Sequence, residues 1–67
     1  MEKWITISGY EIYVIDGKVK RAVKIDGSGG RVTAYVYRQY YTNWVQETDA
    51  TPAAVRSGLK RGTIKIV

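Results

Sequence analysis

Residues 11–23 read EIYVIDGKVKRAV, in which two segments of alternating apolar and polar residues lie on either side of Asp16-Gly17. Asp-Gly between alternating segments is the strongest short-range signal for a β-hairpin with a two-residue turn, because both turn positions need a positive φ angle. These residues therefore predict an antiparallel hairpin. Its expected register pairs Val14 with Val19, Ile12 with Arg21 and Tyr10 with Val23.

Two further turn signals extend this hairpin in both directions. At residues 26–30, DGSGG combines three glycines with Asp and Ser, which supply positive φ angles and local hydrogen bonds, so residues 27–30 are interpreted as a four-residue loop. At Ser8-Gly9 the apolar residues switch from odd to even positions, which favours a tight turn over a one-residue bulge. The pairs predicted by these two turns are Val23 with Ala34, Ile25 with Val32, Ile5 with Ile12 and Ile7 with Tyr10.

The three turns predict one common apolar face. Only Arg21 interrupts it, and its long stem can extend past the core to solvent or to a carboxylate such as Glu47 or Asp49. Because three separately placed turns agree on one buried face, the sequence indicates a four-stranded antiparallel meander. The residues of the predicted face are Ile5, Ile7, Tyr10, Ile12, Val14, Val19, Val23, Ile25, Val32, Ala34 and Val36.

Residues 51–62, TPAAVRSGLKRG, predict a short helix that covers the apolar face. Thr51 is a favourable N-cap, Pro52 suits the first helical position, and Gly62 follows a basic pair, as a C-terminal stop does. Gly58 weakens the helix by about 1 kcal/mol relative to Ala, so tertiary packing has to support it. The alternating segment TIKIV that follows predicts a last strand at an edge of the sheet.

The predicted fold class is therefore α+β: a small antiparallel meander sheet of four to five strands with one short C-terminal helix packed on one face. Residues 1–67 are expected to form a single domain, since a chain of 67 residues is too short for two. In architecture this arrangement is similar to the small basic chromatin proteins of archaea and to the DNA-binding arms of some integrases. Lower lysine density than in the chromatin proteins and the extra final strand depart from these patterns, and no functional residue is carried over.

The opposite face of the predicted sheet carries aromatic and basic side chains. The register places Trp4, Tyr13, Lys20 and Tyr37 in one row, with Tyr35 beside the row and Lys18 and Lys24 pointing the same way. Exposed rings stack unpaired bases while neighbouring cations contact phosphates. The alternative is structural, because aromatic residues are favoured in strands and cross-strand pairs stabilise sheets. The candidate nucleic-acid-binding residues are Trp4, Tyr13, Lys18, Lys20, Lys24, Tyr35 and Tyr37, with Arg56, Lys60 and Arg61 of the helix as a secondary contact.

Three more aromatic residues, Tyr40, Tyr41 and Trp44, lie past the regular part of the predicted fourth strand, in RQYYTNWVQETDA. We expect them to fold a loop back over the sheet edge and to pack there, because a small core needs large side chains at its ends. They are therefore not counted among the candidate binding residues.

The residue types make an enzyme an unfavoured interpretation. The chain has neither His nor Cys, so the usual catalytic triads, thiol nucleophiles and imidazole metal ligands are excluded. Its six acidic residues are scattered, and only Glu47 and Asp49 are close in sequence, where they favour a helix N-terminus. The DGSGG loop lacks the lysine and the following helix of a phosphate-cradling loop. We therefore predict no enzymatic activity, no metal site and no cofactor.

The net charge of +5, from eleven Lys and Arg against six Asp and Glu, favours acidic partners. We expect DNA or RNA as the partner. The alternative is a protein-interaction or homodimerisation module that docks by its aromatic face or by an exposed strand edge. No apolar segment has the length of a signal peptide or a membrane span, and the lack of Cys favours a reducing compartment, so we expect a cytoplasmic protein without a membrane contact.

Overall fold

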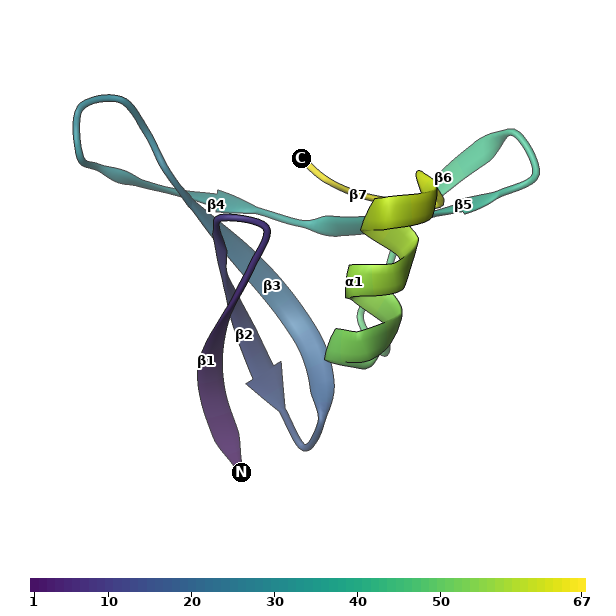
Figure 1. Ribbon diagram of the computed structural model, residues 1–67, viewed down its shortest axis with the longest axis horizontal. Helices are drawn as coiled ribbons and strands as arrows, with labels where there is room; N and C mark the ends of the chain where they lie inside the picture. Colours follow the sequence, from purple (N-terminus) through teal and green to yellow (C-terminus); the bar gives the residue numbers. More distant parts are fainter.

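The computed structural model describes all 67 residues, Met1–Val67, as an α+β fold of two antiparallel sheets and one helix (Figure 1). The elements in chain order are β1 (Glu2–Ile7), β2 (Tyr10–Ile15), β3 (Lys18–Ile25), β4 (Arg31–Ala34), β5 (Val36–Tyr40), β6 (Asn43–Gln46), α1 (Pro52–Arg61) and β7 (Ile64–Ile66). The first sheet has the strand order β1-β2-β3-β4 and the second has the order β6-β5-β7. The predicted α+β class, with a four-stranded antiparallel meander and a C-terminal helix, is confirmed.

The first two turns lie where the sequence predicts them. Ser8 and Gly9 have φ angles of 51° and 82°, and Asp16 and Gly17 have φ angles of 51° and 77°, as two-residue hairpin turns require. The predicted pairs of Ile5 with Ile12, Ile7 with Tyr10 and Val14 with Val19 are confirmed. Local turn chemistry was therefore sufficient to set the register of β1 on β2.

A β-bulge at Lys20 changes the register of β3. Val14 pairs with Val19, but Tyr13 pairs with Arg21, so that Lys20 is an extra residue in β3. The predictions that Ile12 faces Arg21 and Tyr10 faces Val23 are wrong: the observed pairs are Ile12 with Ala22 and Glu11 with Val23. Because the bulge reverses the alternation of β3, the small residue Ala22 enters the core and Arg21 leaves it.

The loop between β3 and β4 is one residue longer than predicted. Ile25 pairs with Arg31 and Val23 with Thr33, so the predicted pairs of Val23 with Ala34 and Ile25 with Val32 are wrong. The cause is Asp26, whose Oδ1 accepts hydrogen bonds from the Ser28 amide at 2.9 Å, the Ser28 hydroxyl at 2.7 Å and the Gly30 amide at 2.8 Å. Because of these bonds Asp26 belongs to the loop and not to β3, and the loop is five residues long.

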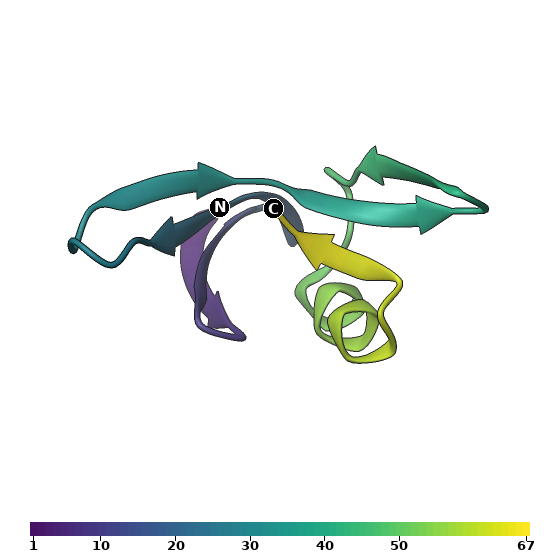
Figure 2. The ribbon, with the colours of Figure 1, turned by 90° about the horizontal axis from the view of Figure 1, so that it is seen from above.

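One almost continuous strand connects the two sheets. β4 and β5 are separated only by Tyr35, whose amide and carbonyl both bond to Val67, at 2.8 Å and 3.0 Å. The last strand, predicted to join an edge of the sheet, pairs with β5, which continues the edge strand β4, and there Val36 faces Ile66. Figure 2 shows β4 and β5 running along one side of the molecule, while the β1–β2 turn and α1 lie together on the other side.

The helix ends are those that the sequence predicts. The Thr51 hydroxyl accepts a hydrogen bond from the Ala54 amide at 3.2 Å, Pro52 begins the helix, and Gly62 has a φ angle of 84° in the left-handed C-cap position. α1 buries Val55 against the inner side of the first sheet and against β7. The core consists of Ile7, Ile12, Val14, Val19, Ala22, Ala34, Val36, Ala50, Val55 and Ile64.

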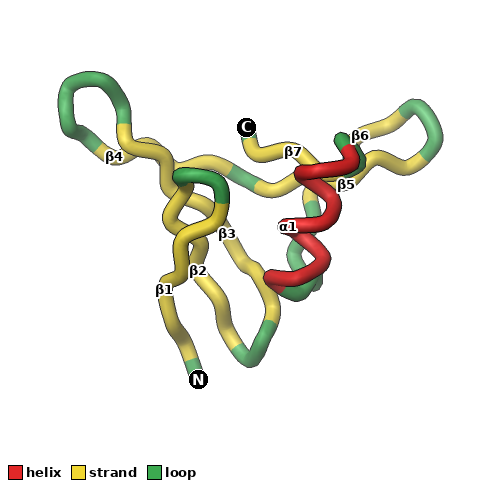
Figure 3. Tube along the Cα trace, in the orientation of Figure 1, coloured by secondary structure: helices red, strands yellow, loops and turns green.

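Three members of the predicted apolar face, Val23, Ile25 and Val32, belong neither to this core nor to the partly buried residues packed against it. The bulge turns Val23 to the same side of β3 as Arg21, where it pairs with Glu11. Ile25 is 55% exposed and Val32 is 50% exposed, because the β3–β4 hairpin projects beyond the part of the sheet that α1 covers. Figure 3 shows the loop of this hairpin and that of the β5–β6 hairpin at opposite ends of the molecule. The core is therefore confined to the middle of the fold, and both hairpin tips are left exposed.

Candidate functional site

Trp4, Tyr13 and Arg21 lie side by side on the outer face of the first sheet, away from the core. They occupy paired positions on β1, β2 and β3. The two ring centroids are 4.9 Å apart, with the ring planes inclined by 37°. The guanidinium carbon of Arg21 lies 5.6 Å from the Trp4 ring centroid and 5.3 Å from that of Tyr13. We call these three residues the Trp4 cluster, and Trp4 is 48% exposed within it.

The hydroxyl of Tyr13 is held by an acidic neighbour. It donates a hydrogen bond to Oε2 of Glu2. This bond and the negative charge of Glu2 raise the pKa of the Tyr13 phenol above its ordinary value. The bond orients the Tyr13 ring and places a carboxylate beside it. An anion is therefore attracted to the cluster at Arg21 and repelled at Glu2.

The Trp4 cluster continues toward β4 through Tyr35, and not through Tyr37. Ala22 pairs with Ala34, so Tyr35 lies one residue past this pair, on the same side of the sheet as Arg21. Tyr35 is 42% exposed. The predicted row of Trp4, Tyr13, Lys20 and Tyr37 is therefore wrong in its last two members, because the bulge replaces Lys20 by Arg21. Tyr37 belongs to the second sheet, where it faces Gln46 and Lys65.

The three candidate lysines of β3 do not lie together. Lys18 pairs with Ile15 and shares the outer face of the Trp4 cluster. Lys20 is turned away, with its ammonium 3.2 Å from the carbonyl oxygen of Thr48 and 3.8 Å from Oδ1 of Asp49. Lys24 is exposed and pairs with Val32, on the opposite side of the sheet from Arg21. Of the three, only Lys18 accompanies the aromatic residues.

A second pairing of an aromatic ring with a cation lies on the second sheet and was missed in the sequence. The ammonium of Lys65 is 4.3 Å from the ring centroid of Trp44. Trp44 belongs to β6 and not to a loop, because the β5–β6 turn needs only two residues between Tyr40 and Asn43. No glycine marks this turn; Tyr41 takes the positive φ angle of 56° itself. The alternation of TIKIV was the one signal that could have put Lys65 on a sheet face.

The packing role predicted for Tyr40 and Tyr41 is wrong. Tyr41 is 97% exposed and Tyr40 is 50% exposed, since both lie near the tip of the β5–β6 hairpin, which projects from the body of the fold. Trp44 is half-buried.

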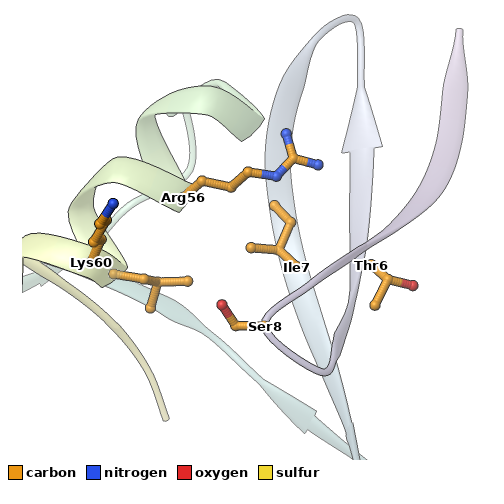
Figure 4. Close-up of a pocket in the computed structure, with 6 residues that line it drawn as sticks. Thr6, Ile7, Ser8, Arg56 and Lys60 are labelled. Atoms are coloured by element: carbon orange, nitrogen blue, oxygen red, sulfur yellow. The ribbon is translucent and has the colours of Figure 1, made fainter.

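The helix brings a further basic group to the β1–β2 turn. A cleft of about 490 Å³ lies between them, lined by Thr6, Ile7, Ser8, Arg56, Leu59 and Lys60. Figure 4 shows the side chains of Arg56 and Lys60 on the helix side of this cleft and Ser8 opposite them. Arg61, the third predicted cation of the helix, is exposed but does not line the cleft.

The basic residues near the C-terminus are not neutralised by acidic ones. Residues 50–67 contain four basic residues and no acidic residue. Every acidic side chain of the chain bonds elsewhere: Glu2 to Tyr13, Glu11 to Arg31, Asp16 to the N-terminus, Asp26 within its own loop, Glu47 to Arg38, and Asp49 to Lys20. Arg56, Lys60, Arg61 and Lys65 form no ion pair, so α1 and β7 carry four uncompensated positive charges.

No group of three or more metal-ligating side chains comes together anywhere in the structure. α1, the one helix, is too short and too polar to cross a bilayer. No protein-family model matches the chain, and searches of curated proteins and of solved structures found no similar protein.

Proposed function

We propose that this protein binds single-stranded DNA or RNA on the outer face of its first sheet. The observation that carries the proposal is the Trp4 cluster: two adjacent rings and a guanidinium on a sheet face that the helix does not cover, with Trp4 and Arg21 exposed and Tyr13 half-buried. Exposed aromatic side chains on a sheet are used to stack unpaired bases, and arginine adds both stacking and charge.

Each residue of the outer face has a distinct role in this proposal. Trp4 provides the stacking surface for one base, and Tyr35 extends the platform toward β4. Tyr13 supports the Trp4 ring and is itself fixed by Glu2. Arg21 attracts the phosphate that joins neighbouring nucleotides, because its guanidinium is the one cation held against both rings.

The experiment is a fluorescence-anisotropy titration of labelled single-stranded DNA and RNA oligonucleotides at two salt concentrations. We expect Trp4→Ala and Arg21→Ala each to weaken binding about tenfold or more, since stacking a base on an aromatic ring contributes roughly 1 to 3 kcal/mol. The matched control for Arg21→Ala is Lys20→Ala, which removes a neighbouring cation directed toward Thr48. Absence of binding at low salt, or equal losses for these two variants, would refute the proposal.

A second candidate function is suggested by the β5–β6 hairpin. Tyr40, Tyr41 and Val45 are all exposed on this hairpin, and β6 is an open edge of its sheet. Tyrosine-rich edges are typical of protein-docking surfaces. If the hairpin mediates self-association, sedimentation velocity will show a concentration-dependent dimer that Tyr41→Ser abolishes. A monomer at all concentrations would exclude self-association through this edge.

A further inference from the structure

The cleft between the β1–β2 turn and α1 combines a hydrophobic floor with cationic walls. Ile7 is only 3% exposed and closes the floor, together with the partly buried Leu59. Arg56 and Lys60 are four residues apart and so project from the same face of α1. In Figure 4 the Arg56 side chain reaches from the helix past Ile7 toward the strands.

Arg56 and Lys60 both line the cleft, and neither has an acidic partner. Like charges four residues apart on a helix repel one another, so this arrangement opposes folding in the absence of an anion. The helix dipole favours Lys60, which belongs to the last turn. It does not account for Arg56, which lies in the middle of the helix, where the dipole has little effect.

Ser8 adds a neutral hydrogen-bond donor to the opposite wall. Its φ angle of 51° in the β1–β2 turn presents the side chain to the helix, as Figure 4 shows. No side-chain hydrogen bond within the protein uses the Ser8 hydroxyl. Thr6 lines the cleft as well, but its side chain lies on the other side of β1 in Figure 4 and is not a donor to it.

We infer that this cleft binds one phosphate group. The Arg56 guanidinium can donate two parallel hydrogen bonds to two phosphate oxygens, and Lys60 and Ser8, which line the same cleft, are the further donors. The source of this phosphate rests on the proposed function: we assign it to the backbone of the bound single-stranded DNA or RNA. β1 leads from Trp4 on the outer face to Ser8 at the cleft, a length of about 13 Å at 3.3 Å per residue. A single-stranded nucleic acid with a base stacked on Trp4 would therefore reach the cleft by passing around the β1–β2 turn.

The first experiment uses inorganic phosphate and two-dimensional NMR of the labelled protein. We expect saturable shifts at the amides of Ser8, Gly9 and Lys60. Arg56→Gln and Lys60→Gln should each weaken this binding at least fivefold, whereas Arg61→Gln, an equal charge change outside the cleft, should leave it within twofold. Ser8→Gly removes the hydroxyl while tolerating the positive φ angle, and should weaken binding severalfold.

The second experiment measures the salt dependence of oligonucleotide binding. Each phosphate contact contributes about 0.7 to the slope of log K against log salt for a single strand. Arg56→Gln should therefore reduce the slope by about 0.7, while Trp4→Ala should reduce affinity with the slope unchanged. In addition, the oligonucleotide should displace inorganic phosphate from the cleft.

These outcomes separate the two proposals. Saturable phosphate binding that depends on Arg56 supports the cleft even if no oligonucleotide binds, in which case the ligand is free phosphate and the proposed function fails. Oligonucleotide binding with an unchanged slope in Arg56→Gln overturns the assignment of the cleft to the strand. Absence of saturation by phosphate, or equal effects of Arg61→Gln and Arg56→Gln, overturns the phosphate site.

Discussion

Gly58 of α1 lies directly against Ile64 of β7. A Cβ atom built at residue 58 would be 2.5 Å from both Cγ1 and Cδ1 of Ile64, which is closer than side-chain atoms approach one another. Gly58 is buried, and Ile64 is only 2% exposed. The glycine that the sequence marks as a weak point of the helix is therefore the residue that lets the helix approach the last strand.

Gly58→Ala should destabilise the protein even though alanine favours a helix by about 1 kcal/mol. Overpacking against Ile64 costs typically about 1 to 3 kcal/mol, so a net loss of about 1 kcal/mol is expected. Urea denaturation will measure it. Ser57→Ala, at the neighbouring exposed position, serves as the control and should be neutral or slightly stabilising. If Gly58→Ala is stabilising, α1 does not pack this closely on β7.

Glu47 and Arg38 form the most shielded ion pair, with side chains 14% and 28% exposed and Nε 2.6 Å from Oε2. The hydrogen bond from Arg38 lowers the pKa of the Glu47 carboxyl below its ordinary value. The ion pair of Glu47 with Arg38 therefore contributes fully to the free energy of unfolding above the unfolded-state pKa of Glu47, about 4.3. This contribution is lost as the pH falls through the lower folded-state pKa.

We expect Glu47→Gln to cost about 1 to 2 kcal/mol near pH 7. The difference between the variant and the wild type should shrink as the pH falls below about 4, because protonation removes the same charge in the wild type. Urea denaturation across this pH range measures both values. A deficit that stayed constant down to pH values where the carboxyl is protonated would show that the charge of Glu47 is not its cause.

Asp26 organises the tip of the β3–β4 hairpin, and the hydrogen bonds that it accepts, led by that from the Ser28 hydroxyl, lower the pKa of its carboxyl. Asp26→Ala should increase hydrogen exchange of the Ser28 and Gly30 amides while changing global stability by no more than about 0.5 to 1 kcal/mol, because the loop is exposed. NMR exchange rates will show this. Ser28→Ala should have a weaker effect, since it removes only one of the three bonds.

The bulge at Lys20 leads to a prediction about deletion. If Lys20 is removed, Val19 and Arg21 become adjacent and still pair with Val14 and Tyr13. The side chains of β3 then alternate regularly between the two faces of the sheet, and no core residue moves to the outer face. The deletion variant should therefore fold and unfold cooperatively, with stability within about 2 kcal/mol of wild type. The control is deletion of Thr6, which turns the side chains on one side of the deletion in β1 to the opposite face of the sheet. If both deletions unfold the protein equally, the bulge is essential to the sheet.

The features that the sequence predicted correctly are those determined by a few adjacent residues. Asp16-Gly17 and Ser8-Gly9 specify their turns, and Thr51 and Gly62 specify the ends of the helix. The register of β1 on β2 followed directly from these turns, and with it the contact of Trp4 with Tyr13.

The features that the sequence did not predict depend on interactions between distant residues, or on residues without a distinctive preference. Lys20 is an ordinary strand residue, so nothing marks it as a bulge, and the candidate site was assigned the wrong cation as a result. Val36 pairs with Ile66 although β6 and α1 lie between them in the chain, and no local sequence pattern predicts this pairing. Tyr41 adopts a positive φ angle without being glycine, which concealed the β5–β6 turn.

The strand shared between the two sheets sets an order of events in folding. The meander from β1 to β4 is built from hairpins closed by short turns, whereas β5 and β7 are separated in the chain by β6 and α1. Closing a longer loop costs more chain entropy, so the contacts of the meander are expected to form first and those of Ile66 last. Because β4 runs into β5 through Tyr35, the completed meander presents β5 as an extended template, and the last strand docks on a surface that already exists.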